Sequence, residues 1–208
     1  MRGRQPGILL ILLATALAAT GLAGCAHNRP APDLSWSAAD MAALTHFSVQ
    51  GKVGFRHGET GGSAALTWQQ DGDRYRMMAH GPLGQGATRI SGDSALIRIE
   101  DKQGAHESDD PEALLAEAIG WPVSINSLAF WVRGLPAPGS EAAIENDPAG
   151  RPLKIRQQNW EISLDRYRPD GSVASRRTLP HRIIAIGGDS RVTLLIERWN
   201  LGGQQKKP

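Results

Sequence analysis

Cysteine is almost absent from this chain, since Cys25 is the only one among 208 residues. A single thiol excludes an intrachain disulfide and any zinc site built from several thiolates. The six histidines stand far apart in the sequence, and no G-x-S-x-G, H-E-x-x-H or P-loop motif occurs. The sequence therefore predicts no metal site, no cofactor and no enzymatic activity.

An excess of charge of either sign is also missing. The chain has 23 basic and 21 acidic residues, and the two become equal once Arg2 and Arg4 are removed with the segment that we expect to be cleaved. Adjacent basic residues occur only at 176–177 and 206–207. Because a nucleic-acid-binding surface needs clustered basic residues, we predict no nucleic-acid partner.

Long hydrophobic runs are limited to residues 8–19, which follow Arg2 and Arg4. This run is too short to span a bilayer comfortably, and a basic start, an apolar run and small residues are typical of a secretory signal. The sequence LAGC at residues 22–25 resembles the bacterial lipobox, which implies cleavage before Cys25 and covalent acyl chains on it. A soluble exported protein with a chance cysteine is the alternative.

The residues after Cys25 predict how the mature chain is organised. Ala26 stands where an inner-membrane lipoprotein commonly has aspartate, so the resemblance implies the outer membrane, with the domain facing the periplasm. Pro30 and Pro32 lie in a segment with few apolar side chains, which favours an extended tether. We therefore divide the chain into a cleaved signal peptide (1–24), a lipid-anchored tether (25–36), one folded domain (37–201) and a disordered tail (202–208).

Apolar and polar residues alternate in many short segments of the domain. Residues 47–55 are the clearest case, and residues 187–189 have the composition of a hairpin turn. Such one-sided alternation at close spacing predicts an antiparallel sheet with one buried face. The other predicted strands cover residues 64–68, 75–77, 97–99, 160–164, 183–186 and 192–199.

Three short helices are predicted between and before these strands. Ser37 and Asp110 are suited to cap the first two helices, and apolar residues at helical spacing predict a third over residues 128–135. The fold class is therefore mainly β with short helices (α+β), with a sheet curled around the helices. Composition leaves open whether the interior is solid or hollow.

The central segment resembles the LolB family of outer-membrane lipoprotein receptors. The resemblance rests on GWPV at residues 120–123, Leu128 and WVRGLP at 131–136. It is supported by the lipobox, by WQQ at 68–70 with Tyr75 and Arg76, by PLG at 82–84, and by Trp199 with Asn200. It implies an unclosed antiparallel β-barrel, or half-barrel, with a helical lid over a hydrophobic cavity.

The same resemblance implies a function in lipoprotein localisation. Members of this family accept acylated lipoproteins from the periplasmic carrier LolA and insert them into the inner leaflet of the outer membrane. This implies an acylated cargo, a carrier of LolA type and a membrane surface as partners. We expect a monomer that works without ATP.

The segment Pro82, Leu83 and Gly84 has the composition of a turn between two strands. The residues alone leave two alternatives, a leucine that projects from the tip or a loop that folds back over it. In LolB-like proteins a protruding leucine in the matching turn serves membrane insertion. The resemblance therefore implies this role for Leu83.

Apolar residues on the predicted strand and helix faces are candidates for the lining of an acyl-chain cavity. A shift of one residue in a strand would move its set to the other face. The candidates are Val49, Val53, Leu66, Trp68, Met77, Ile97, Ile99, Trp131, Leu135, Ile162, Leu164 and Leu194.

Three other functions remain open from the residues. A solid β core would suit an anchored scaffold that binds a partner protein. The carboxylates of Asp109 and Asp110 would suit a glycan-cleaving lipoprotein, although Asp110 also suits a helix cap. A carrier of LolA type would share the hollow sheet, but the lipobox argues against it because a shuttling carrier must not be anchored.

Overall fold

The computed structural model of the chain describes residues 36–81, 86–170 and 177–201. Leu34–Pro208 forms one compact unit, distinct from Met1–Asp33. The predicted signal peptide, Cys25 and nearly all of the tether lie outside the described residues, as does the predicted tail at 202–208.

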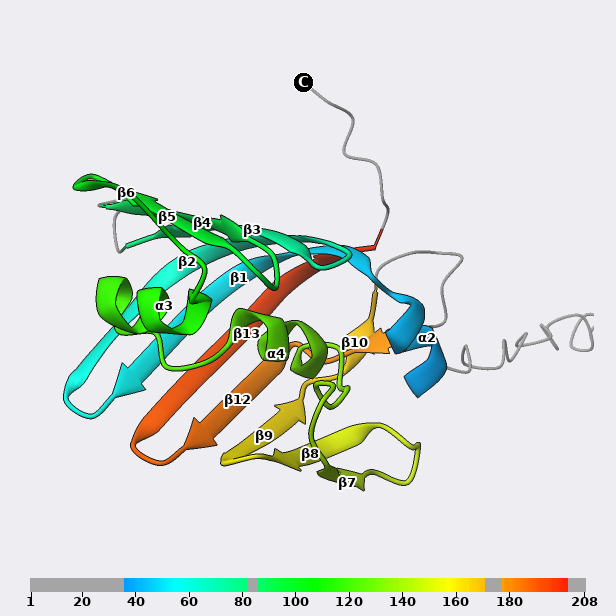
Figure 1. The fold of residues 1–208 in the computed structure, drawn as a ribbon. Coiled ribbons are helices and arrows are strands. Elements are labelled where there is room, and N and C mark those ends of the chain that lie inside the picture. Colours follow the sequence, from blue (N-terminus) through cyan, green and yellow to red (C-terminus); the bar gives the residue numbers. More distant parts are fainter. Residues whose placement is uncertain (1–35, 82–85, 171–176, 202–208) are drawn as a thin grey trace, which may run out of the picture. The chain divides into compact units, whose positions relative to one another are not determined.

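One antiparallel sheet of eleven strands dominates the fold (Figure 1). Its strand order is β6-β5-β4-β3-β2-β1-β13-β12-β9-β8-β7, so most neighbours in the sheet are also neighbours in the sequence. The strands are β1 (His46–His57), β2 (Thr60–Asp71), β3 (Arg74–His80), β4 (Ala87–Gly92), β5 (Ile97–Asp101), β6 (Gly104–Ser108), β7 (Ala142–Asn146), β8 (Pro152–Gln157), β9 (Trp160–Asp165), β12 (Arg182–Gly187) and β13 (Ser190–Asn200).

The sheet curls but does not close. Within the described residues, β6 and β7 are its two edges and do not pair with each other. A separate two-stranded ladder joins β10 (Arg168–Pro169) to β11 (Thr178–Leu179). The predicted α+β class and half-barrel architecture are confirmed.

Strand alternation places one face of the sheet in the core. In β1, Phe47, Val49 and Val53 are buried, as are Ile162 and Leu164 in β9. The predicted hairpin is also confirmed, because β12 ends at Gly187 and β13 begins at Ser190.

Three helices lie on the concave side of the sheet or at its end (Figure 1). They are α2 (Ala38–Ala43), α3 (Pro111–Ile119) and α4 (Ile125–Trp131). The Ser37 side chain accepts a hydrogen bond from the backbone N–H of Asp40, and the Asp110 side chain accepts one from Ala113. Both predicted caps are confirmed.

The third predicted helix has different bounds. Helix α4 starts at Ile125 rather than at residue 128, and it ends at Trp131 rather than at residue 135. Backbone hydrogen bonds from Arg133 to Phe130 and from Gly134 to Trp131 tighten the chain into turns after the helix. Gly134 adopts a φ of 81°, which favours glycine and ends any helical path there.

A buried glutamine fixes the segment that follows α4. The Gln157 side chain accepts hydrogen bonds from the indole Nε1 of Trp131 at 3.0 Å and from the backbone N–H of Ala137 at 2.8 Å. Its Nε2 donates to the carbonyl of Ala137 at 2.6 Å and to the Ser140 hydroxyl at 2.9 Å. One side chain thus anchors α4 and the turn after it to β8.

Replacing Gln157 by leucine is therefore expected to destabilise the domain by about 3 kcal/mol, because it leaves several buried polar groups without partners. Urea unfolding followed by tryptophan fluorescence measures this loss. The matched control is Gln103→Leu at an exposed turn position, which should change stability by less than about 0.5 kcal/mol. Equal stability of the two variants would contradict the anchoring role.

Candidate functional site

An apolar cavity of about 230 Å³ lies between the helices and the concave face of β1–β4. The helix side contributes Ile119 at the end of α3, Trp121 in the connection, and Ile125 and Leu128 of α4. Apart from the hydroxyl-bearing Ser63 and Thr88, the sheet side has only apolar side chains and glycines. The sheet side consists of Val53, Phe55, Gly62, Ser63, Ala64, Leu66, Met77, Ala79, Gly81, Gly86, Thr88 and Ile90.

A gradient of side-chain size along β2 creates this cavity. The inward positions of β2 are Gly62, Ala64, Leu66 and Trp68, so the side chains grow steadily along the strand. Gly62 and Ala64 leave space beneath α3, Leu66 borders that space, and Trp68 fills the interior beyond it. The exposed Gly62 and Gly86 lie at the rim, which places the mouth of the cavity at this end of the sheet.

The opposite end of the interior is solid. The Phe47 ring packs against the indoles of Trp68 and Trp199, with centroids 5.6 Å and 5.5 Å apart. The indole of Trp68 donates to the Gln70 side chain at 2.9 Å. These rings fill the apolar interior at this end, and the hollow of about 580 Å³ that borders Phe47 and Gln70 is lined mainly by polar side chains.

All twelve predicted lining residues are buried in the core. Val53, Leu66 and Met77 line the cavity described above. The other nine pack in the core and do not border it; they are Val49, Trp68, Ile97, Ile99, Trp131, Leu135, Ile162, Leu164 and Leu194.

The sequence prediction missed several residues of the lining. Phe55 continues the alternation of Val53, and the increase in size from Gly62 to Trp68 was readable in the sequence. Trp121 and Leu128 belong to the central segment that carried the family resemblance. Ile90, Ile119 and Ile125 reach the cavity through tertiary packing, which no local pattern indicated.

The two helices over the cavity are attached very differently. Helix α4 buries Ile125, Leu128, Ala129 and Trp131, whereas α3 buries only Leu115. Burial of one such side chain contributes about 1.5–3 kcal/mol. Opening α3 is therefore much less costly than opening α4.

A buried arginine strengthens the attachment after α4. The Arg133 guanidinium donates to the carbonyls of Met41 at 3.0 Å and Leu44 at 2.8 Å, where α2 ends. It also lies 4.9 Å from the centroid of the Phe130 ring. Desolvation lowers the pKa of Arg133 below its ordinary value, but carbonyls at a helix C-terminus favour the cation. Arg133 thus ties α2 to the segment after α4.

Gly120 is the joint between the two helices. It has a φ of 64°, and a Cβ there would lie 3.4 Å from a Thr60 methyl group on β2. The backbone conformation favours glycine, whereas the Thr60 methyl group lies at ordinary van der Waals distance. The chain can therefore turn sharply between α3 and α4, directly above the cavity.

The glycines on either side of the predicted insertion turn line the cavity. Pro82, Leu83 and Gly84 lie outside the described residues, but Gly81 and Gly86 on either side of them line the cavity. The backbone N–H of Gly81 donates to the carbonyl of Gly86 at 3.2 Å. This bond joins the residue after β3 to the residue before β4.

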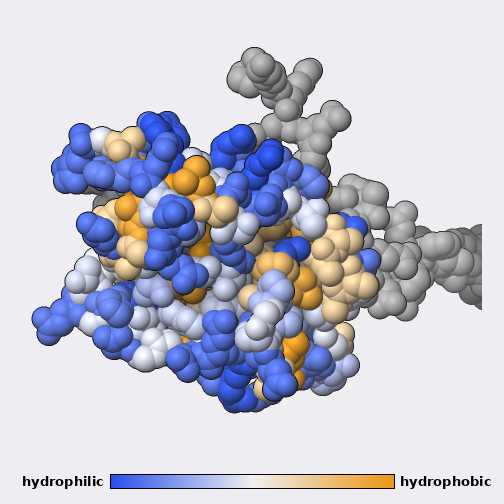
Figure 2. All heavy atoms as spheres, in the orientation of Figure 1, coloured by the Kyte–Doolittle hydropathy of each residue, from blue (hydrophilic) through white to orange (hydrophobic). Residues whose placement is uncertain are grey.

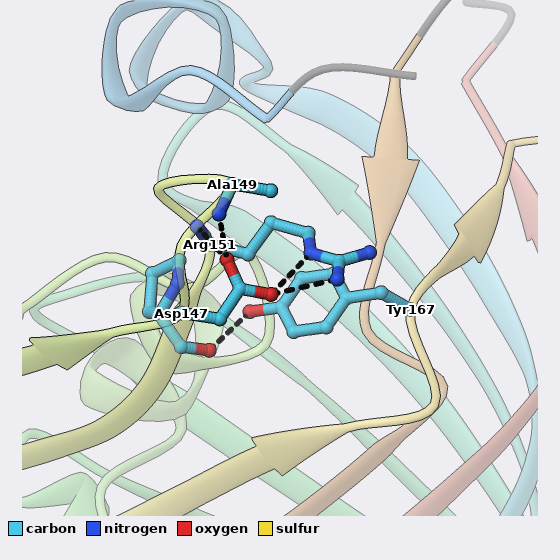
Figure 3. A network of polar contacts seen from close by, with 5 residues as sticks. Asp147, Ala149, Arg151 and Tyr167 are labelled. Carbon is cyan, nitrogen blue, oxygen red and sulfur yellow. Dashed lines mark hydrogen bonds and ion pairs between the residues drawn. The ribbon is translucent and has the colours of Figure 1, made fainter. Parts of the chain in front are cut away.

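A cluster of polar contacts lies near the β7–β8 edge of the sheet (Figure 3). Asp147 accepts hydrogen bonds from Arg151 and from the backbone of Ala149, and the Tyr167 hydroxyl donates to the Pro152 carbonyl at 2.6 Å. Burial alone would raise the pKa of Asp147, but these donors hold it below its ordinary value. The cluster fixes the β7–β8 turn and lies away from the cavity.

Across residues 36–81, 86–170 and 177–201, no group of three or more acidic, histidine or cysteine side chains could hold a metal ion. In those ranges no helix has the length and apolar character needed to cross a bilayer. Apolar side chains do reach the surface around α3 (Figure 2), so the cavity is the candidate site.

Comparison with known proteins agrees with this architecture. The family model "Outer membrane lipoprotein LolB" matches residues 45–199. The outer-membrane lipoprotein LolB of Chromohalobacter salexigens is 38% identical over 187 residues, covering 86% of both chains. Its counterpart in Cellvibrio japonicus is 36% identical over 198 residues, covering 93% of this chain and 98% of the relative.

Proposed function

Because this chain belongs to the LolB family of outer-membrane lipoproteins, we propose that it accepts acylated lipoproteins from a periplasmic carrier of LolA type and inserts them into the inner leaflet of the outer membrane. Its own acyl chains on Cys25 would anchor it there. The observation that carries the proposal is the apolar cavity beneath α3, whose rim includes both ends of the predicted insertion turn. No enzymatic step is needed.

The cost of exposing lipid explains why a cavity is required. Leaving an acyl chain in water costs about 0.8 kcal/mol per methylene, or about 12 kcal/mol for sixteen carbons, and a triacylated cargo has three such chains. Free diffusion across the periplasm is therefore excluded. Since reversible affinities saturate near 20 kcal/mol, the cavity shields only part of the lipid and receives it by direct contact with the carrier.

Helix α3 is the part of the lid that admits the chain. A cavity of about 150 Å³ already takes up benzene, so 230 Å³ accommodates a short stretch of hydrocarbon but not three acyl chains. Movement of α3 about Gly120 exposes Leu115 and the partly buried Leu114 and Ile119, which is less than opening α4 would expose, and it enlarges the space. Release into the bilayer is downhill, because the membrane offers a larger apolar volume, and it needs no ATP.

Transfer from a loaded carrier tests the proposal. The unlipidated mature chain, residues 25–208, is mixed with carrier that holds a fluorescently labelled triacylated lipoprotein. We expect the label to move to this protein and then to vesicles of outer-membrane phospholipids, without nucleotide. A protein that binds neither this cargo nor a free lipopeptide, yet captures a periplasmic partner, would instead be the scaffold with a solid core.

A further inference from the structure

The indole N–H of Trp121 is a buried polar group in a residue that lines the cavity. Trp121 connects α3 to α4, is only 8% exposed and lines the cavity, with its ring edge-on to Phe55 at a centroid distance of 5.8 Å. Its Nε1 is closed to solvent in this conformation and has no hydrogen-bond acceptor among the described residues. A buried donor without a partner costs free energy, so it calls for an explanation.

Other tryptophans of the domain show that such a donor is normally satisfied here. The indoles of Trp36, Trp68, Trp131 and Trp199 each donate to an oxygen within 3.3 Å. Trp121 differs from them in bordering the cavity rather than a filled part of the core. A molecule that enters the cavity as α3 moves about Gly120 would supply the missing acceptor.

The side chains that line the cavity indicate the chemistry of that molecule. A hydrocarbon chain suits the apolar side chains but offers nothing to an N–H donor. An acyl chain differs from a plain hydrocarbon by the carbonyl oxygen at its head, an acceptor joined directly to the apolar part. Both the ester-linked and the amide-linked chains of a lipidated cysteine have this carbonyl.

We propose that Trp121 is a positioning residue whose Nε1 donates a hydrogen bond to the acyl carbonyl of the bound lipid. This inference rests on the proposed function and deepens it, because the hydrogen bond sets how far the acyl chain enters the cavity. With the carbonyl held at the junction of α3 and α4, the alkyl chain extends under the lid past Val53 and Leu66. The site then distinguishes acyl lipids from molecules with alkyl chains alone.

Matched ester and ether ligands test this assignment. A diacylated lipopeptide and its dialkyl-ether analogue have the same chain length, but the analogue lacks the carbonyls. We expect the unlipidated mature chain to bind the ester roughly fivefold more tightly than the ether, as one hydrogen bond implies. In Trp121→Phe, which keeps an aromatic ring but loses the donor, this ratio should fall to about one.

A control variant isolates the donor from general effects of losing an indole. Trp36→Phe removes an N–H that donates to the Arg133 carbonyl and does not line the cavity, so its ester-to-ether ratio should match the wild type. An ester preference that survives in Trp121→Phe would overturn the inference, as would its absence from the wild type. Binding of neither lipopeptide by the wild type would overturn the proposed function itself.

A measurement on the unmodified sequence keeps the inference testable if Trp121→Phe does not fold. In protein labelled with ¹⁵N-tryptophan, one indole N–H resonance should shift on adding the ester and stay in place on adding the ether. Equal shifts with both ligands would contradict the hydrogen bond. A second pair, an ester phospholipid and its ether analogue, shows whether the carbonyl comes from cargo or from membrane lipid. A shift with either ester supports the hydrogen bond from Trp121.

Discussion

Ala64→Phe is expected to weaken the uptake of acylated cargo about 50-fold while the domain stays folded. Ala64 is one of the small inward residues at the start of β2. It pairs with Val53 on β1 and borders the cavity. A phenyl ring at this position would occupy the space that we assign to lipid. Each methylene that loses its place costs about 0.8 kcal/mol, so displacing three of them lowers affinity about 50-fold.

The neighbouring residue provides the control for this prediction. Ala65 is exposed on the opposite face of β2, where it pairs with Lys52 and His80. Ala65→Phe adds the same ring to the same strand, so it should leave uptake unchanged. Transfer from the loaded carrier measures both variants, and thermal unfolding verifies that both are folded. Full uptake by Ala64→Phe would show that lipid does not enter beneath α3.

The buried face of the sheet could be predicted from the sequence because its signal is local. Successive side chains of a strand point to opposite faces, so Val49 and Val53, or Ile162 and Leu164, identify their buried face without knowledge of the partner strands. The same holds for the helix caps, where Ser37 and Asp110 need only the next three residues. These local rules gave the correct fold class.

The cavity itself could not be located in this way. A buried leucine such as Leu164 and a cavity-lining leucine such as Leu66 look the same in the sequence, because what differs is the size of the residues opposite them. The lid adds Ile119 and Ile125 from a distant segment. The cavity therefore depends on how several elements pack together, which no single segment of the sequence shows.

The strands at the two edges of the sheet were also missed. Strand β6 (Gly104–Ser108) is almost wholly exposed, and β7 (Ala142–Asn146) has only its first residue partly buried. An edge strand with no buried face does not need the alternation by which strands are recognised. Strand β8 (Pro152–Gln157) begins with a proline, which ordinarily argues against a central strand.

Leu83→Glu is expected to abolish insertion of cargo into the membrane and to leave its uptake intact. The leucine falls between Gly81 and Gly86 in the sequence, and both glycines line the cavity, so we propose that lipid leaves the cavity at this end of the sheet. Burial of a leucine in the bilayer contributes about 1.5–3 kcal/mol, whereas a carboxylate must be desolvated to enter. The insertion rate should fall more than about tenfold.

Uptake from the carrier and insertion into vesicles are measured as separate steps. Cargo that moves from the carrier to Leu83→Glu, but not from there to vesicles, shows that the turn acts after the cavity. The control is Leu83→Met, which keeps a flexible apolar side chain of similar volume and should insert cargo at close to the wild-type rate. Insertion by Leu83→Glu at the wild-type rate would remove the turn from the pathway, and lipid would then have to reach the bilayer through the opening beneath α3 alone.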